Sequence, residues 1–191
     1  LRAECQQLSE QLQQALDSLD EAGTIKTNDD YYSLLGDIHY DLGNHSESIK
    51  AYEQLAAIAA DVAYPHVQNV YNYLALEDVP SAYEAAEKAL ALEPENVEAV
   101  TALGNIYGWE TKYRKAYAFF QQAVEIDPEY ATGHVNSMWA LYNSGLYRKC
   151  LEYGVSVADK FPSDPDIYGY IGDSLSKLQE TEKAVENYQK A

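Results

Sequence analysis

The feature that most constrains the fold of this chain is a 34-residue period that runs from about residue 29 to the end. Pro94, Pro128 and Pro162 lie one period apart. Small residues in the middle of each unit recur at the same spacing: Ala82, Ala116, Cys150 and Ala184. A period of roughly 20 to 50 residues is typical of solenoids and arrays, in which each unit packs on its neighbours. The period therefore predicts a repeat protein instead of a single globular core.

The unit at residues 97–130 indicates what each repeat contains. Val100, Leu103 and Ile106 follow helical spacing, and a second apolar series begins at Tyr113 after a break at residues 110–112. The proline near the end of the unit lacks an amide donor and restricts the residue before it, so it ends the second helix. Each unit is thus predicted to be a pair of short amphipathic helices.

The motif Leu103-Gly104-x2-Tyr107, followed by Ala116-x3-Phe120-x2-Ala123 and Pro128, resembles the tetratricopeptide repeat (TPR). This resemblance implies an all-α fold, a right-handed α-solenoid of helix-turn-helix repeats with an additional N-terminal helix. It covers residues 29–191, with the fifth unit ending inside its second helix. The five expected repeats are 29–62, 63–96, 97–130, 131–164 and 165–191.

The second and fourth repeats depart from this pattern. Asn69-Val70 and Ser137-Met138 stand where Leu-Gly is usual, and Gly154 replaces an aromatic residue.

Composition says more about which kinds of partner the chain can bind than about its fold. The chain has 191 residues, 47% of them hydrophobic, yet no stretch approaches the roughly 20 apolar residues of a membrane span. Its net charge of −18 argues against nucleic acid and anionic membranes, which attract basic surfaces. We therefore expect a protein or peptide partner that is apolar, aromatic or basic. Two cysteines are too few for a disulfide framework, and Cys150 is expected to pack in the core.

Residues 1–23 do not follow the repeat, and two interpretations of them stay open. Apolar residues alternate at spacings of four and three on a Gln-rich segment that Gly23 ends: Leu1, Cys5, Leu8, Leu12, Ala15, Leu19 and Ala22. The helix that this pattern predicts could cap the first repeat as the remnant of an earlier one. It could equally dimerise as a short coiled coil, which would make the protein a homo-oligomer. Because no Met begins the chain and its last repeat stops inside a helix, we expect a piece of a longer protein.

A candidate binding surface follows from the resemblance, which implies that the first helix of each repeat lines a concave face. Aromatic side chains there would bury a large area at little entropic cost, and asparagine amides could both donate to and accept from a peptide backbone. The alternatives are that the tryptophans fill space between adjacent first helices and that the amides are solvated. The candidates at or beside the implied positions are Tyr40, Tyr71, Asn105, Trp109, Asn136, Trp139, Tyr142 and Asn143.

The charged residues give a weaker indication. Asp30, Asp37 and Asp41 would make one entrance of this face acidic and suited to Lys or Arg in a ligand, although solvated acids are more common. The positions at which some related domains hold a terminal carboxylate carry no basic residue here. The basic pairs at 114–115 and 148–149 are interpreted as surface charges near the outer edge.

Catalytic chemistry is not indicated. The four histidines are scattered, and no phosphate-binding loop, nucleophile elbow or closely spaced Cys/His set occurs. We therefore expect neither an enzyme nor a cofactor or metal site. The predicted function is a protein-interaction module that binds a peptide segment in its concave groove. The alternative is a structural scaffold that self-associates through the N-terminal helix or the repeat ends.

Overall fold

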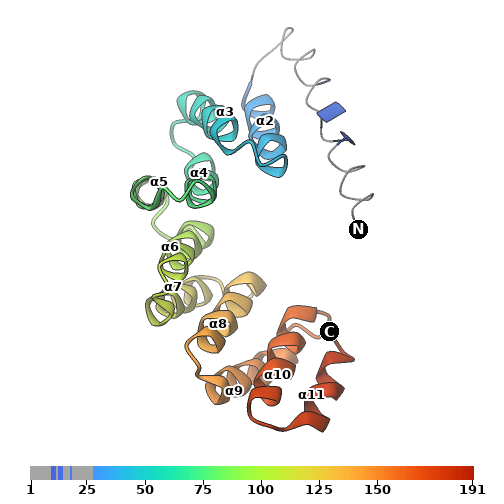
Figure 1. The fold of residues 1–191 in the computed structure, drawn as a ribbon. Coiled ribbons are helices and arrows are strands. Elements are labelled where there is room, and N and C mark those ends of the chain that lie inside the picture. The colour runs from blue at the N-terminus through green and yellow to red at the C-terminus, as the bar shows by residue number, and fades with distance from the viewer. Residues whose placement is uncertain (1–9, 12, 15–17, 19–27) are drawn as a thin grey trace. The chain divides into compact units, whose positions relative to one another are not determined.

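The computed structural model describes residues 10, 11, 13, 14, 18 and 28–191. Between residues 28 and 191 all regular secondary structure is helical (Figure 1). The helices are α2 (Asp29–Asp41), α3 (His45–Ile58), α4 (Tyr64–Ala75), α5 (Val79–Leu92), α6 (Val97–Trp109), α7 (Tyr113–Ile126), α8 (Ala131–Asn143), α9 (Tyr147–Ala158), α10 (Pro165–Lys177) and α11 (Thr181–Tyr188). The helix predicted over residues 1–23 falls almost entirely outside the described residues, so its capping and coiled-coil interpretations both stay predictions.

Local sequence explains where several helices begin. The Asn28 side chain accepts a hydrogen bond from the Tyr31 amide at 3.0 Å, and the Asp78 side chain accepts one from the Ser81 amide at 3.2 Å. Asp164 caps α10 in the same way, and Pro165 occupies its first turn, where no amide donor is needed. The break predicted at residues 110–112 lies between α6 and α7, as expected.

The turn inside each helical pair has one repeated geometry. The residue at the equivalent place has a positive φ in all five turns: Gly43 (74°), Glu77 (60°), Thr111 (58°), Gly145 (73°) and Gln179 (66°). The next amide then donates to the carbonyl five residues back, as from Lys112 to Tyr107 at 2.8 Å. This is the hydrogen bond of a Schellman motif, which satisfies a carbonyl that the helix end would otherwise leave unpaired.

The described residues form two compact units, divided between Ala99 and Val100 in the first turn of α6. In the first unit, α2 packs on α3, α3 on α4 and α4 on α5 (Figure 1). A buried polar chain also joins the first three of these helices. The Ser48 hydroxyl donates to the Gly36 carbonyl at 2.8 Å, and the Asn72 amide donates to the Ser48 oxygen at 2.9 Å.

In the second unit, α7 packs on α8, α8 on α9, α9 on α10 and α10 on α11. Its larger core includes Met138, Cys150, Ile167 and Ile171, all less than a tenth exposed. Cys150 is fully buried among them, which confirms its predicted packing role, and burial raises the pKa of its thiol.

The departures of the second and fourth repeats have a steric explanation. In the first, third and fifth repeats a glycine on the first helix faces an aromatic ring on the second, and the three pairs are Gly36 with Tyr52, Gly104 with Phe120, and Gly172 with Tyr188. In the fourth repeat the sizes are exchanged, because the Met138 side chain fills the space beside Gly154. The second repeat has Val70 and Ala86 at these places, and both are buried. A large residue on either helix fills the same crossing, provided that its partner is small.

Candidate peptide-binding site

All eight predicted binding residues lie on the first helix of a helical pair. Tyr40 is on α2 and Tyr71 on α4, both in the first unit. The other six lie in the second unit, where α6 carries Asn105 and Trp109, and α8 carries Asn136, Trp139, Tyr142 and Asn143. Each unit is therefore considered as a separate surface.

In the first unit the two tyrosines differ in availability. Tyr40 is 39% exposed, and its ring meets the His45 ring edge-on at a centroid distance of 5.4 Å. Tyr71 is half-buried and interacts with a neighbouring group. Tyr40 is thus the more accessible of the two.

The two tryptophans of the second unit have different environments. Trp109, the last residue of α6, is 50% exposed. Trp139 is half-buried, and its ring atom Cη2 lies 2.6 Å from where a Cβ of Gly108 would be. Its ring also meets Tyr113 and Phe120 edge-on, at centroid distances of 5.4 and 6.4 Å. The indole of Trp139 therefore packs α8 against α6 and α7, whereas that of Trp109 is accessible.

Tyr142 belongs to an aromatic group that spans three helices of the second unit. Its ring centroid lies 5.2 Å from that of Tyr147 on α9 and 6.1 Å from that of Tyr170 on α10. The ring is half-buried. It can offer one edge to a ligand while its other contacts hold it in place.

The asparagines are only partly available. Asn143 is exposed, and its amide nitrogen donates to the Trp139 carbonyl at 2.8 Å, which leaves its side-chain oxygen as the acceptor for a ligand. Asn136 is half-buried on α8, and Asn105 is half-buried and interacts with a neighbour. Asn143 and Trp109 are therefore the two exposed members of the predicted set in this unit.

The acidic entrance predicted in the first unit is smaller than expected. The Asp37 carboxylate accepts hydrogen bonds from the Tyr52 hydroxyl at 2.5 Å and from the Tyr64 hydroxyl at 3.0 Å. Burial and these contacts with Asp37 raise the pKa of both tyrosines. Asp30 and Asp41 are exposed, but Asp37 is half-buried and binds the helices together.

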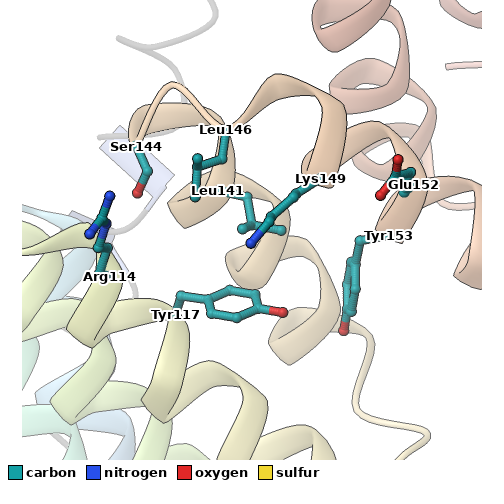
Figure 2. Close-up of a pocket in the computed structure, with 8 residues that line it drawn as sticks. All are labelled: Arg114, Tyr117, Leu141, Ser144, Leu146, Lys149, Glu152 and Tyr153. Carbon is teal, nitrogen blue, oxygen red and sulfur yellow. The ribbon is translucent and has the colours of Figure 1, made fainter.

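A groove away from the predicted binding residues lies in the second unit between α7 and α9 (Figure 2). Its volume is about 670 Å³. The C-terminal end of α8 and the following turn complete it with Leu141, Ser144 and Leu146. The remaining lining residues are Arg114 and Tyr117 from α7 and Lys149, Glu152 and Tyr153 from α9.

The wall of this groove is fixed by a partly buried polar network. The Tyr153 hydroxyl accepts from the Gln121 amide at 3.0 Å and lies 2.8 Å from Nδ1 of His134. Nε2 of His134 lies 3.0 Å from the Pro128 carbonyl, which can only accept. Nε2 therefore carries a proton, and with a neutral ring the Tyr153 hydroxyl donates to Nδ1. Burial raises the pKa of Tyr153.

Comparison with known protein families identifies the family of this chain. The tetratricopeptide repeat profile matches residues 29–62, 97–130 and 165–191. The chain belongs to the tetratricopeptide repeat family. The matched segments are the TPR units with a glycine on the first helix and an aromatic residue on the second.

Solved structures agree with this TPR fold. MamA from Desulfovibrio magneticus RS-1 (residues 41 to the end) is 18% identical, with a TM-score of 0.66 over 85% of this chain and 92% of that chain. A crystal structure of MamA is 19% identical, with a TM-score of 0.65 over 82% of this chain and 91% of that chain. PilF from Pseudomonas aeruginosa is 20% identical, with a TM-score of 0.73 over 91% of this chain and 76% of that chain. At these identities the likeness confirms the expected all-α, TPR-type solenoid class and extends no further.

The chain has no significant match among curated proteins. None of its described helices combines the length and apolar character needed to cross a bilayer. Within the described residues, no group of three or more His, Cys, Asp or Glu side chains could hold a metal ion.

A sequence signal for the groove between α7 and α9 did exist. The tripeptide Tyr-Arg-Lys recurs at residues 113–115 and 147–149, one period apart, and begins α7 and α9. Taken one repeat at a time, the pair of basic residues indicates only surface charge, because a single repeat does not show that α7 and α9 border the same groove at Leu141. The groove is formed jointly by the neighbouring repeats 97–130 and 131–164, so neither repeat contains it alone.

Proposed function

We propose that this TPR chain is a protein-interaction module, and that its second unit binds an apolar peptide segment of a partner protein against α6 and α8. The observation that carries this proposal is the exposure of the Trp109 indole on a first helix. A large exposed indole stabilises a complex by burying apolar area while losing few rotamers. Asn143 supplies an amide oxygen for the ligand backbone, and the half-buried rings of Trp139 and Tyr142 supply a rigid wall.

Affinity capture from the native host tests this proposal. We expect Trp109→Ala to reduce the capture of the principal partner by about 30-fold or more, which corresponds to a hot-spot loss of roughly 2 kcal/mol. Val155→Ala is the matched control, because Val155 is 59% exposed but lies on the second helix α9. Equal capture by the native chain and both variants would remove the peptide-binding proposal.

The roles of Trp139 and Tyr142 in binding have to be tested with substitutions that preserve their packing. Since both rings pack against neighbouring helices, replacement by alanine would combine lost binding with lost stability. Tyr142→Phe keeps the ring contacts and removes only the hydroxyl. We expect it to retain partner capture if Tyr142 acts through its ring.

Self-association is the second candidate function, and one observation favours it. Helix α11 exposes half of the Val185 side chain and 45% of Tyr188. Apolar area of this kind on a repeat surface can pack on another copy. Static light scattering of the chain and of Val185→Lys tests it, because a monomer in both samples would leave this surface without a role in assembly.

A further inference from the structure

We propose that the groove between α7 and α9 is a second binding site, which takes an acidic peptide segment by one apolar side chain and an adjacent carboxylate. None of its lining residues belongs to the set predicted to bind peptide on the first helices. The two proposals are therefore independent.

The lower part of the groove is apolar and already formed. Leu141 is buried, and the half-buried Tyr117, Leu146 and Tyr153 pack against the same core. A volume of about 670 Å³ lies in the range of roughly 300 to 1,000 Å³ that is typical of ligand pockets. Because the network behind Tyr153 holds its ring, an apolar side chain can enter without ordering a loop first.

The rim of the groove is cationic in a chain that is strongly acidic. The sequence has 13 Lys and Arg residues against 31 Asp and Glu, yet Arg114 and Lys149 meet at this groove from two different helices. Both side chains are exposed, and neither has an ion-pair partner within the described part of the chain. Figure 2 shows the Lys149 side chain extending over the middle of the groove toward Tyr117, with Arg114 at the Ser144 end. Two unpaired cations beside an apolar floor favour a ligand that carries a negative charge.

The charges also suggest a direction for the ligand. Glu152, the acidic residue of the rim, lies at the Tyr153 end of the groove (Figure 2). A ligand carboxylate is attracted between Arg114 and Lys149 and repelled near Glu152. The apolar anchor then lies on Tyr117, Leu141 and Leu146, with the acidic residue of the ligand next to it toward Arg114. A partner that presents Lys or Arg between Arg114 and Lys149 would be repelled.

Selection from a phage-displayed library of random peptides tests the proposal with a defined probe. We expect the selected peptides to pair an aromatic or aliphatic residue with a neighbouring Asp or Glu. For such a peptide, labelled and titrated by fluorescence anisotropy, Lys149→Glu should weaken binding by about tenfold or more. Arg148→Glu is the matched control, because it makes the same charge change at the preceding residue of α9 but does not line the groove. It should change the dissociation constant by less than about threefold.

Several outcomes would overturn the proposal. Equal weakening by Lys149→Glu and Arg148→Glu would mean that the peptides respond only to overall charge. Loss of binding in Trp109→Ala, with none in Lys149→Glu, would place the selected peptides on the first helices instead. A dimer in sedimentation equilibrium that Lys149→Glu converts to a monomer would show that a second copy occupies the groove. The substituted residues are exposed, so matching helical content by circular dichroism verifies that each variant is folded.

Discussion

At the scale of single residues, the helix crossings of this TPR chain are controlled by the joint volume of two side chains. Gly104 lies so close to Phe120 that an added Cβ would be 2.3 Å from a ring carbon. In the fourth repeat the small residue is instead Gly154, and Met138 and Ile171 fill its space. Each crossing thus tolerates one large residue, on one helix or the other.

The first prediction tests this volume rule. Gly104→Ala should lower the free energy of unfolding by about 2 to 3 kcal/mol, because the aromatic ring cannot bend away from the new methyl group. Gly169→Ala is the control in a helix of the same unit, since an added Cβ there meets nothing within 4 Å. We expect it to raise stability by about 0.5 to 1 kcal/mol through higher helix propensity. Urea denaturation measures both, and a neutral Gly104→Ala would contradict the rule.

Tyr188 on the last helix should ionise at a higher pH than an ordinary tyrosine. The Tyr188 hydroxyl donates to the Asp173 carboxylate at 2.8 Å, and this bond is the main reason that the pKa of Tyr188 rises from 10 to about 12. Because the folded pKa is above the unfolded one, the bond contributes stability below pH 10 and loses it as the pH rises through about 12.

Ultraviolet difference titration of the native chain and of Asp173→Asn measures this shift. We expect the variant to show one tyrosine that ionises at lower pH than in the native chain. Identical titration curves would contradict the assignment of the shift to Asp173.

At the scale of elements, the five intra-repeat turns share one backbone geometry but not one residue type. Glycine occupies the positive-φ place in two of them, at Gly43 and Gly145, while Thr111 adopts a φ of 58° in the third. A β-branched residue is strained in this left-handed region, whereas glycine is not. The turn is therefore imposed by packing of the two helices and is retained despite a local cost.

This comparison predicts a stabilising substitution. Thr111→Gly should raise the free energy of unfolding by about 1 kcal/mol, because it removes the left-handed penalty of a side chain. Gly145→Ala at the equivalent place should lower it by a similar amount. Thermal denaturation followed by circular dichroism measures both changes as shifts in Tm. A lower Tm for Thr111→Gly would mean that contacts of the threonine side chain stabilise the fold by more than the strain of its backbone destabilises it.

At the scale of the whole molecule, the dominant property is a net charge of −18 on 191 residues. Like charges at this density repel one another and destabilise any compact state, and dissolved salt screens the repulsion. We therefore expect Tm to rise by several degrees when NaCl increases from about 10 to about 500 mM. Equal shifts in NaCl and KCl would identify screening as the cause, and a Tm that falls with salt would contradict it.

Sequence alone determined the fold class and the placement of the candidate residues on helices. A period of 34 residues with two apolar series per unit specifies helical pairs, because the pattern is local and is repeated along the chain. The resemblance to the TPR implied that the aromatic and amide candidates lie on the first helices, where the structure also has them. The role of residues 1–23 stays a prediction.

Tertiary structure decided which of those residues are accessible. Asp37 accepts hydrogen bonds from Tyr52 and Tyr64, and the Trp139 indole lies against Gly108. Both arrangements depend on side chains contributed by a neighbouring helix, which a position within one repeat does not reveal. The groove beneath Lys149 is of the same kind, since its residues come from α7, α8 and α9 and meet only when the repeats stack. Periodicity specifies the elements because it is local to each helix, whereas exposure, hydrogen bonding and concavity arise where neighbouring helices pack together.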